Sequence, residues 1–287
     1  MRGEITLRKT LEEYKTVYMA YRNFSPRTRV EYVNDLTDLD KHLEKQRIRK
    51  VIDVQLIHLI HYIAELEHRG FAGSTRKRKV ISIRSFFTYL KLEGYVITDI
   101  GNRLIPPHVE PSTPRYLSKR EVDQLLKVSE ANIRDFAIIR VLLQTGIKLS
   151  EITNLKLGDL RTIDSLESGL KVFDLMIVKG EGMNRGREVV LEESSSSAIK
   201  SYLRVRGKSK SESVFLNKLG EPLGKRGVEK IIYKYLKLAG IENANLNSLR
   251  HTFGATQVSR GYKLNKIQRA MGHKDIKTTG KYVHLRG

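Results

Sequence analysis

The chain has 287 residues, no cysteine, and 53 Lys and Arg against 32 Asp and Glu. The lack of cysteine excludes disulfides, thiolate nucleophiles and cysteine-bound zinc, and no apolar run reaches the roughly 18 residues that a membrane-spanning helix needs. Because the N-terminus is charged and has no signal-peptide core, we expect a cytoplasmic protein without membrane association. The net charge of +21 favours a polyanionic partner, since neutralised phosphates release counterions, although a basic proteome or ribosome association would also raise it.

Residues 1–104 are expected to form a helical domain. Ser25 and Pro26 have the form of an N-cap followed by proline at the first helical position. Apolar residues then recur at intervals of three and four, which is typical of helices with one buried face. The predicted faces are Tyr32, Leu36, Leu39 and Leu43; Val51, Val54, Ile57, Ile60, Ile63 and Leu66; and Val80, Ile83, Phe87 and Leu90.

A run of cations lies in the first turns of the helix that Ser74 opens. These residues are Arg76, Lys77, Arg78 and Lys79. The N-terminal end of a helix favours anions, so an isolated protein gains little from cations there. A bound phosphate backbone would make this choice favourable, and we therefore predict that the run contacts DNA. The alternative is a basic face that only solvent touches.

Residues 105–115 carry four of the six prolines of the chain. Proline has a fixed φ and no backbone N–H, so such a segment favours an extended linker. The chain is therefore predicted to divide into a helical domain at 1–104, this linker, and a second domain at 116–287.

The second domain is predicted to combine helices with a few strands. Ser118 and Glu121 form a capping box that starts a helix. Apolar segments at 171–178 and 187–191 predict two strands around a glycine-rich loop. The fold class is thus mainly α, with a helical N-terminal domain and a mixed α+β second domain that holds a small antiparallel sheet. Helices are expected at about 118–129, 132–144, 226–239 and 248–260, with a short one capped by Asn265 and ending at Met271.

The last forty or so residues combine polar side chains that no core requires. Arg250 and His251 lie near the start of the predicted helix 248–260, where backbone N–H groups already favour an anion. His273 is expected on a turn, and Tyr282 follows it. Each residue alone would indicate packing or a surface contact, so their joint order carries the signal.

These motifs resemble those of the tyrosine site-specific recombinases, also called the phage-integrase family, in their Xer-like two-domain form. Arginine and histidine lie 23 residues apart, and histidine and tyrosine nine (273 − 250 = 23; 282 − 273 = 9), spacings that suit the family. Three linked motifs in this order are far more specific than any one of them. The matching runs are Arg250-His251-Thr252-Phe253, Met271-Gly272-His273 and Thr278-Thr279-Gly280-Lys281-Tyr282.

The resemblance implies a metal-independent DNA strand transferase without a cofactor, in which residues 1–104 form a core-binding domain and residues 116–287 the catalytic domain. Tyr282 would attack a phosphodiester and form a 3′-phosphotyrosine link, which a second DNA end can reverse. Arg250 would bind the scissile phosphate, His273 would hydrogen-bond a non-bridging oxygen, and Lys179 would protonate the leaving oxygen, with Arg185 as the substitute. The expected partners are double-stranded DNA and further copies of the chain, as a homotetramer in the synaptic complex. The reaction would integrate, excise or resolve a mobile element or a chromosome dimer.

Two positions depart from the family pattern. Lys148 stands where the run Thr-Gly-x-Arg-x-Ser-Glu has a catalytic arginine, and lysine lacks the bidentate fork. Losing one transition-state donor costs ~3 kcal/mol, about a hundredfold in rate, so we expect intact DNA binding and slow cleavage. Asn247 stands where the family has a histidine. Asparagine can donate a hydrogen bond to phosphate but cannot act as a base.

Two neighbours of these motifs complete the expected site. Glu151 lies one turn after Lys148 and would orient that basic residue. His251 is interpreted as a core histidine rather than a catalyst, and both Glu151 and His251 are grouped with the DNA-contacting residues. The alternatives to a recombinase are a catalytically inactive, sequence-specific DNA-binding regulator, which the two departures favour, and a type IB topoisomerase, which shares the chemistry.

Overall fold

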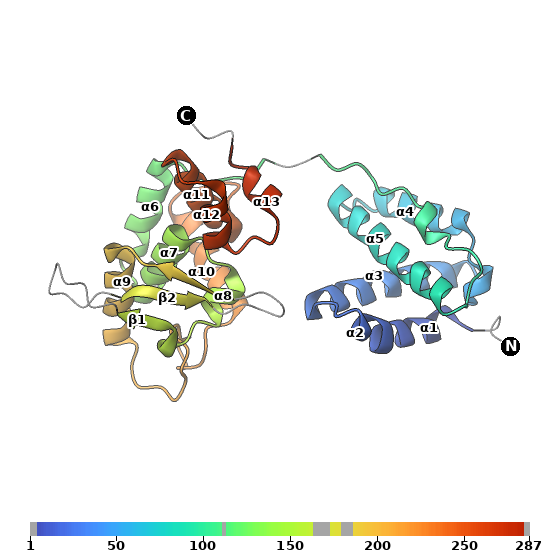
Figure 1. Cartoon of the computed structure of the whole chain (residues 1–287), viewed down its shortest axis with the longest axis horizontal. Coiled ribbons are helices and arrows are strands. Elements are labelled where there is room, and N and C mark those ends of the chain that lie inside the picture. The colour runs from blue at the N-terminus through green and yellow to red at the C-terminus, as the bar shows by residue number, and fades with distance from the viewer. Residues whose placement is uncertain (1–4, 111–112, 163–172, 179–185, 284–287) are drawn as a thin grey trace. The chain divides into compact units, whose positions relative to one another are not determined.

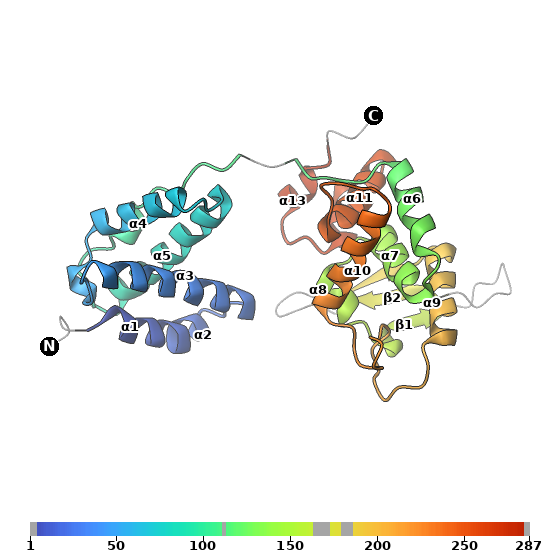
Figure 2. The same cartoon turned by 180° about the vertical axis from the view of Figure 1, so that it is seen from behind.

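The computed structural model describes residues 5–110, 113–162, 173–178 and 186–283. The chain divides into two compact units, residues 1–111 and 112–287, each described by itself (Figure 1, and Figure 2 from behind). The division falls inside the proline-rich stretch 105–115 that the sequence predicts as a linker. Among the described residues, no helix is both long enough and apolar enough to cross a membrane.

Unit 1 is built from helices. Ser25 caps α3 as predicted, because its hydroxyl accepts the Thr28 N–H at 3.1 Å and Pro26 follows at the first helical position. A π-type turn at Tyr14–Tyr18 joins the first two helices, and 3-10 turns lie at Val51–Asp53 and Gly101–Arg103. The helices are α1 (Leu7–Glu13), α2 (Met19–Tyr21), α3 (Pro26–Lys45), α4 (Leu56–His68) and α5 (Gly73–Leu92).

The core of unit 1 lies between α3, α4 and α5. Tyr62 and Ile83 have no exposed surface there. The face predicted for the segment 51–67 is partly wrong, because Ile57 and Ile60 are 46% and 45% exposed. α4 begins only after a separate 3-10 turn, so the apolar repeat that starts in that turn does not continue in phase along the helix.

Unit 2 combines helices with an antiparallel sheet in the order β1-β2-β3, which confirms the predicted fold class. The predicted capping box is present, since Ser118 Oγ accepts the Glu121 N–H at 3.3 Å and Glu121 accepts the Ser118 N–H at 2.8 Å. The sequence does not predict β1. The elements are α6 (Lys119–Ser129), α7 (Ile133–Thr145), α8 (Leu149–Thr153), β1 (Leu160–Thr162), β2 (Phe173–Val178), β3 (Arg187–Val190), α9 (Glu193–Val205), α10 (Lys225–Leu238), α11 (Leu246–Ser259), α12 (Leu264–Met271) and α13 (Ile276–Gly280).

The sheet places the start of β3 close to the C-terminal helices. β2 pairs with β3 so that Val178, the last residue of β2, lies opposite Arg187, the first of β3. α9 packs against β2 and α7, while α12 packs against β3 (Figure 1). Ile138 and Ile139 of α7 are fully buried at the centre of this arrangement. The strand end at Arg187 therefore lies beside the helices that carry the C-terminal motifs.

Candidate active site

The helix α11 carries three of the motif residues on one face. Asn245 caps it, because its side-chain oxygen accepts the N–H groups of Asn247 and Ser248 at 2.8 and 3.2 Å. Residues three and four positions apart share a helix face, so Asn247, Arg250 and His251 lie on the same side. Asn247 is exposed and Arg250 is buried, so this face runs from the surface into the interior.

Arg250 is the buried cation of this face, with 8% of its surface exposed. Its two terminal nitrogens donate to the carbonyl oxygens of Gly146 and Met271. Gly146 is the left-handed C-cap of α7, and Met271 is the last residue of α12, so both carbonyls belong to the negative ends of helices. Burial lowers the pKa of Arg250 to about 10, and the group therefore keeps its charge at neutral pH.

Lys148 reaches the same turn from the start of α8. Its Nζ donates to the Gly272 carbonyl at 3.1 Å, next to the Met271 carbonyl that Arg250 holds. The Lys148 backbone N–H donates to Glu151 at 2.7 Å, which closes the first turn of α8. A lysine thus lies where the family pattern places an arginine, and a single ammonium stands in for a planar fork.

Arg187 is a site residue that the sequence does not predict. Its guanidinium forms a two-point ion pair with the Glu151 carboxylate at 2.8 and 2.9 Å, and its Nε donates to the Ala270 carbonyl at 2.6 Å. Gly272 lies close beside it, and a Cβ there would lie 2.8 Å from an Arg187 nitrogen, so a larger residue would force the guanidinium to shift. Burial alone would raise the pKa of Glu151, but the bonds from Arg187 and the Lys148 N–H lower it.

These contacts favour a positioning role for Glu151 over the expected contact with DNA. Its carboxylate is directed to Arg187 and to the backbone of Lys148, and its side chain is only 7% exposed. Glu151 therefore positions other residues of the site. The signal for Arg187 in the sequence is its place at the start of the second predicted strand, directly after the glycine-rich loop.

His273 is held at the turn that leaves α12. Gly272 takes the left-handed conformation (φ 63°) that ends the helix, and the next residue, His273, has its Nδ1 2.8 Å from the Thr279 hydroxyl. Burial, with the charges of Arg250 and Lys148, lowers the pKa of His273 to about 4. The ring is therefore neutral at pH 7 and carries one N–H, which leaves one ring nitrogen as a donor and the other as an acceptor.

Tyr282 is buried against α11, with 1% of its surface exposed. Its ring lies flat on Gly254, where a Cβ would come within 2.7 Å of the ring. Its hydroxyl lies 2.6 Å from His251 Nδ1. Burial raises the pKa of the Tyr282 phenol above its ordinary value, although the positive charge of Arg250 acts in the opposite direction.

The structure brings together most of the predicted catalytic residues. Arg250, His273 and Lys148 converge on the turn after α12, and Tyr282 lies against α11 within reach of the charge of Arg250. Asn247 lies at the exposed end of the same face of α11. Lys179 follows directly after β2 and, like Arg185, lies outside the described residues. His251 differs from its interpretation as a core residue, since it is half-buried and contacts the phenol. Within the described ranges, no group of His, Cys, Asp and Glu side chains could hold a metal ion.

Known families match both parts of the chain. The model of the phage integrase family matches residues 115–287, and that of the N-terminal SAM-like domain of phage integrases matches residues 11–94. The chain belongs to the phage integrase family. The recombinase is 30% identical over 276 residues to tyrosine recombinase XerC of Roseiflexus castenholzii. The aligned stretch covers 92% of this chain and 85% of that protein. It is 28% identical to XerC of Listeria innocua, over 92% and 89% of the two chains.

Solved structures share the fold of this recombinase. A lambda integrase dimer bound to a COC′ core site has a TM-score of 0.79 at 15% identity, covering 100% of this chain and 79% of that one. The XerH recombinase bound to its palindromic difH substrate, in a post-cleavage complex, has a TM-score of 0.72 at 21% identity over 97% and 80% of the two chains. At such identities the likeness shows the fold alone.

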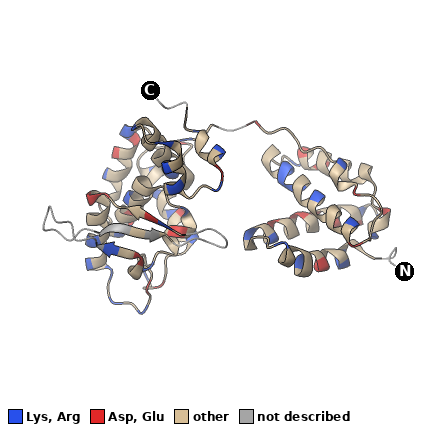
Figure 3. Cartoon of the chain, in the orientation of Figure 1, with Lys and Arg blue, Asp and Glu red and all other residues tan. Residues whose placement is uncertain are grey.

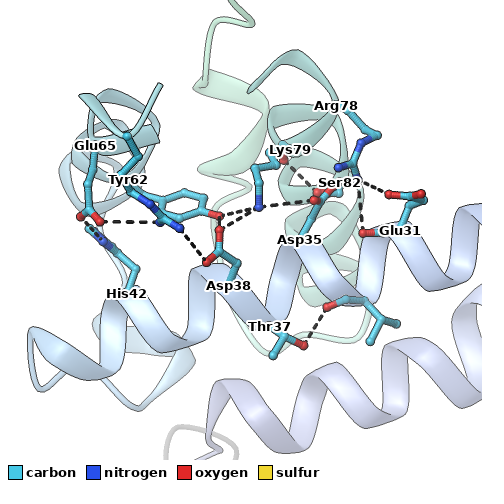
Figure 4. A network of polar contacts seen from close by, with 12 residues as sticks. Glu31, Asp35, Thr37, Asp38, His42, Tyr62, Glu65, Arg78, Lys79 and Ser82 are labelled. Carbon is cyan, nitrogen blue, oxygen red and sulfur yellow. Dashed lines mark hydrogen bonds and ion pairs between the residues drawn. The ribbon is translucent and has the colours of Figure 1, made fainter. Parts of the chain in front are cut away.

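The basic run of α5 in the recombinase faces acidic side chains of α3 (Figure 4). Lys79 is 5% exposed, and its Nζ forms ion pairs with Asp38 at 2.8 Å and Asp35 at 3.4 Å and donates to the Tyr62 hydroxyl at 3.1 Å. Burying a charge is costly unless it is paired, and this network provides the pairs. The prediction that Lys79 contacts DNA gains no support from these contacts, because the charge of Lys79 is paired inside unit 1.

The other three cations of the run differ in their exposure. Arg78 donates to the Asp35 carboxylate and lies 3.2 Å from Glu31. Arg76 pairs with a glutamate of α4 at 2.9 Å, and its side chain is 17% exposed. Lys77 is exposed. A phosphate backbone would therefore meet Lys77 most readily, since the other cations already have carboxylate partners.

Proposed function

We propose that this chain is a Xer-like recombinase that cuts and rejoins duplex DNA at specific sites through a 3′-phosphotyrosine intermediate. The observation that supports this most is the position of Tyr282. Its phenol contacts His251 and is close enough to Arg250 to feel its charge, while Arg250, Lys148 and His273 meet at the turn after α12. Such a grouping suits the transfer of a phosphoryl group to a hydroxyl, because cations stabilise the charge that develops on phosphate oxygens.

Each group has a distinct part in the proposed reaction. Tyr282 Oη attacks the phosphorus and forms a new P–O bond while the bond to the 5′-oxygen breaks. Arg250 and Lys148 neutralise the non-bridging oxygens, and His273 donates its N–H to one of them. Lys179 protonates the departing 5′-oxygen. Asn247, at the exposed end of the α11 face, donates a hydrogen bond to the phosphate backbone.

Double-stranded DNA and other copies of the chain are the proposed partners. The net charge of +21 supports a polyanion, and Lys and Arg positions occur on helices of both units (Figure 3). Lambda integrase, which shares the fold, has been solved as a tetramer on a Holliday junction. We propose that this chain also acts as a tetramer, and that it does so in the cytoplasm.

Lys148 is proposed to make cleavage slow without preventing DNA binding. Its ammonium keeps the charge of an arginine but offers a single donor atom, which the Gly272 carbonyl already contacts. The loss of a bidentate contact in the transition state corresponds to ~3 kcal/mol, or about a hundredfold in rate. Ground-state DNA binding depends on many phosphate contacts and should change little.

The alternative function is a DNA-binding regulator that no longer cleaves. Two observations favour it: Lys148 in an arginine position, and an exposed asparagine at 247 where the family has a histidine. Such a protein would keep the fold and the DNA affinity while its tyrosine stays unused.

A nicked suicide duplex bearing the cognate site, located by footprinting on the host element, separates these functions. In such a duplex the cleaved end diffuses away and the covalent protein–DNA product accumulates. We expect a covalent band for Lys148→Arg, a weaker one for the parent chain, and none when Tyr282→Phe is added. If Lys148→Arg binds the site but forms no band, the recombinase proposal fails and the regulator is favoured.

A further inference from the structure

The phenol of Tyr282 has one hydrogen-bond partner among the residues that the structure describes, and this is His251 Nδ1 at 2.6 Å. We propose that His251 is the general base that takes the proton of Tyr282 in strand cleavage, in the role for which Asn247 is unsuited. This proposal rests on the recombinase function and assigns one of its proton transfers.

Burial leaves the phenol few routes for its proton. Tyr282 is 1% exposed, so bulk water has almost no access to the ring, and the proton must pass to a neighbouring group. Asn247 is exposed, and its amide cannot accept a proton at neutral pH. A general base must lie within about 2.6–3.2 Å of the donor atom, a condition that His251 meets before any DNA binds.

The contact is built into one face of α11. His251 and Gly254 are three residues apart and therefore neighbours on the helix surface. The Tyr282 ring occupies the place that a Cβ at Gly254 would take, since that atom would lie 2.7 Å from ring carbon Cε2. The missing side chain lets the ring lie flat on the helix, and the hydroxyl then reaches the imidazole one turn earlier.

The charges around His251 keep its ring neutral. Burial lowers its pKa below the ordinary 6.5, and the positive charges of Arg250 and Lys281 lower it further. The other titratable neighbours are His273, itself neutral at pH 7, and the phenol. A neutral ring has one unprotonated nitrogen, and in the proposed reaction this is Nδ1, which accepts from the phenol while Nε2 carries the ring proton.

The proton transfer balances with phosphoryl transfer. As Tyr282 Oη forms its bond to phosphorus, its O–H bond breaks and the proton moves to Nδ1, which makes His251 an imidazolium. The 5′-oxygen leaves with a proton from Lys179. In the religation step the tyrosine oxygen is the leaving group, and the same imidazolium returns the proton to it. The DNA phosphate brings a negative charge near the ring, which favours the imidazolium during the step.

Cleavage kinetics on the suicide duplex test this role. In the Lys148→Arg background, His251→Gln should slow covalent product formation by about a hundredfold or more, the size of a general-base contribution. In the Lys148→Arg protein, the cleavage rate should fall as the pH drops through the His251 pKa, which lies below 6.5. When His251→Gln is added, this pH dependence should be absent. Imidazole in solution should partly restore His251→Ala. His61→Gln, at an exposed histidine of α4, is the matched control and should cleave normally.

Gel-shift affinity and circular dichroism confirm that each variant is folded and binds DNA. A His251→Gln rate within about threefold of the parent, or an unchanged pH profile, overturns the proposal. If the Lys148→Arg parent forms no covalent product, the recombinase function fails instead. Histidine ¹⁵N NMR of the protein without DNA then decides the contact itself: an unprotonated Nδ1 that changes with Tyr282→Phe supports it, and a protonated Nδ1 refutes it.

Discussion

Arg187 and Glu151 form a buried ion pair that connects β3 to α8 beside the candidate active site. The two side chains are 16% and 7% exposed, and the guanidinium contacts both carboxylate oxygens, at 2.8 and 2.9 Å. Replacing Arg187 with methionine leaves the Glu151 carboxylate buried with the Lys148 N–H as its remaining hydrogen-bond donor. Because an uncompensated buried charge is costly, we expect Arg187→Met to destabilise unit 2 by about 3–5 kcal/mol.

A double variant distinguishes the cost of leaving the Glu151 charge unpaired from the cost of losing the packing of the Arg187 side chain. Arg187→Met with Glu151→Gln removes the unpaired charge, so its cost should be smaller than that of Arg187→Met alone, and the two single effects should not add. Urea unfolding followed by circular dichroism measures the free energies. The Arg260–Glu192 pair is the control, since both side chains are 54% exposed and their atoms lie 3.5 Å apart. Arg260→Met should cost under about 1 kcal/mol.

Two unfolding results would contradict a stabilising role for the Arg187–Glu151 pair. If Arg187→Met costs no more than Arg260→Met, the buried pair contributes little and Glu151 is neutralised in another way. If the single and double variants lose the same free energy, the methionine acts through packing alone. Either result would remove the basis for assigning Arg187 and Glu151 a positioning role in the site.

Three further outcomes are expected. Gly254→Ala should displace the Tyr282 ring, because its Cβ would lie 2.7 Å from a ring carbon. The yield of covalent product in the Lys148→Arg background should then fall by at least about tenfold. An unchanged yield would contradict the packing of the ring on Gly254. Lys79→Met should destabilise unit 1 by about 3–5 kcal/mol in urea unfolding, and Lys77→Met by under about 0.5 kcal/mol. Of the two variants, only Lys77→Met should reduce the salt dependence of DNA binding. The pKa of His273 falls from 6.5 unfolded to about 4 folded, so the unfolded chain binds the proton first and stability should drop as pH falls from 6.5 towards 4. His273→Gln should flatten that part of the unfolding profile.

Much of the fold follows from local sequence signals. The caps at Ser25 and Ser118 are local interactions between residues three apart, and both are present as predicted. The exposed Ile57 and Ile60 show the limit of periodicity, because an apolar repeat does not say where one turn ends and the next helix begins. The burial and pairing of Lys79 could not be predicted, because its carboxylate partners lie about forty positions away in sequence, beyond the range of helix-end arguments.

The candidate site divides in a similar way. The order of Arg250, His273 and Tyr282 can be recognised in the sequence, since each belongs to a short motif. The contact of His251 with the phenol cannot, because it depends on where the ring packs after a separate helix. Arg187 is also missed, since its role comes from strand register and from the fold that brings β3 beside α12.

The carbonyls that hold Arg250 have a consequence for how a phosphate would be received. A free arginine side chain loses up to about 2 kcal/mol of rotational freedom when it is fixed in one place. Here the anchoring oxygens of Gly146 and Met271 impose that loss during folding, before any nucleic acid arrives. The guanidinium would therefore meet a phosphate in an orientation that folding has already fixed, and the association step would not have to supply that ordering. The same anchoring limits adaptation, so a bound DNA backbone would have to move to the arginine.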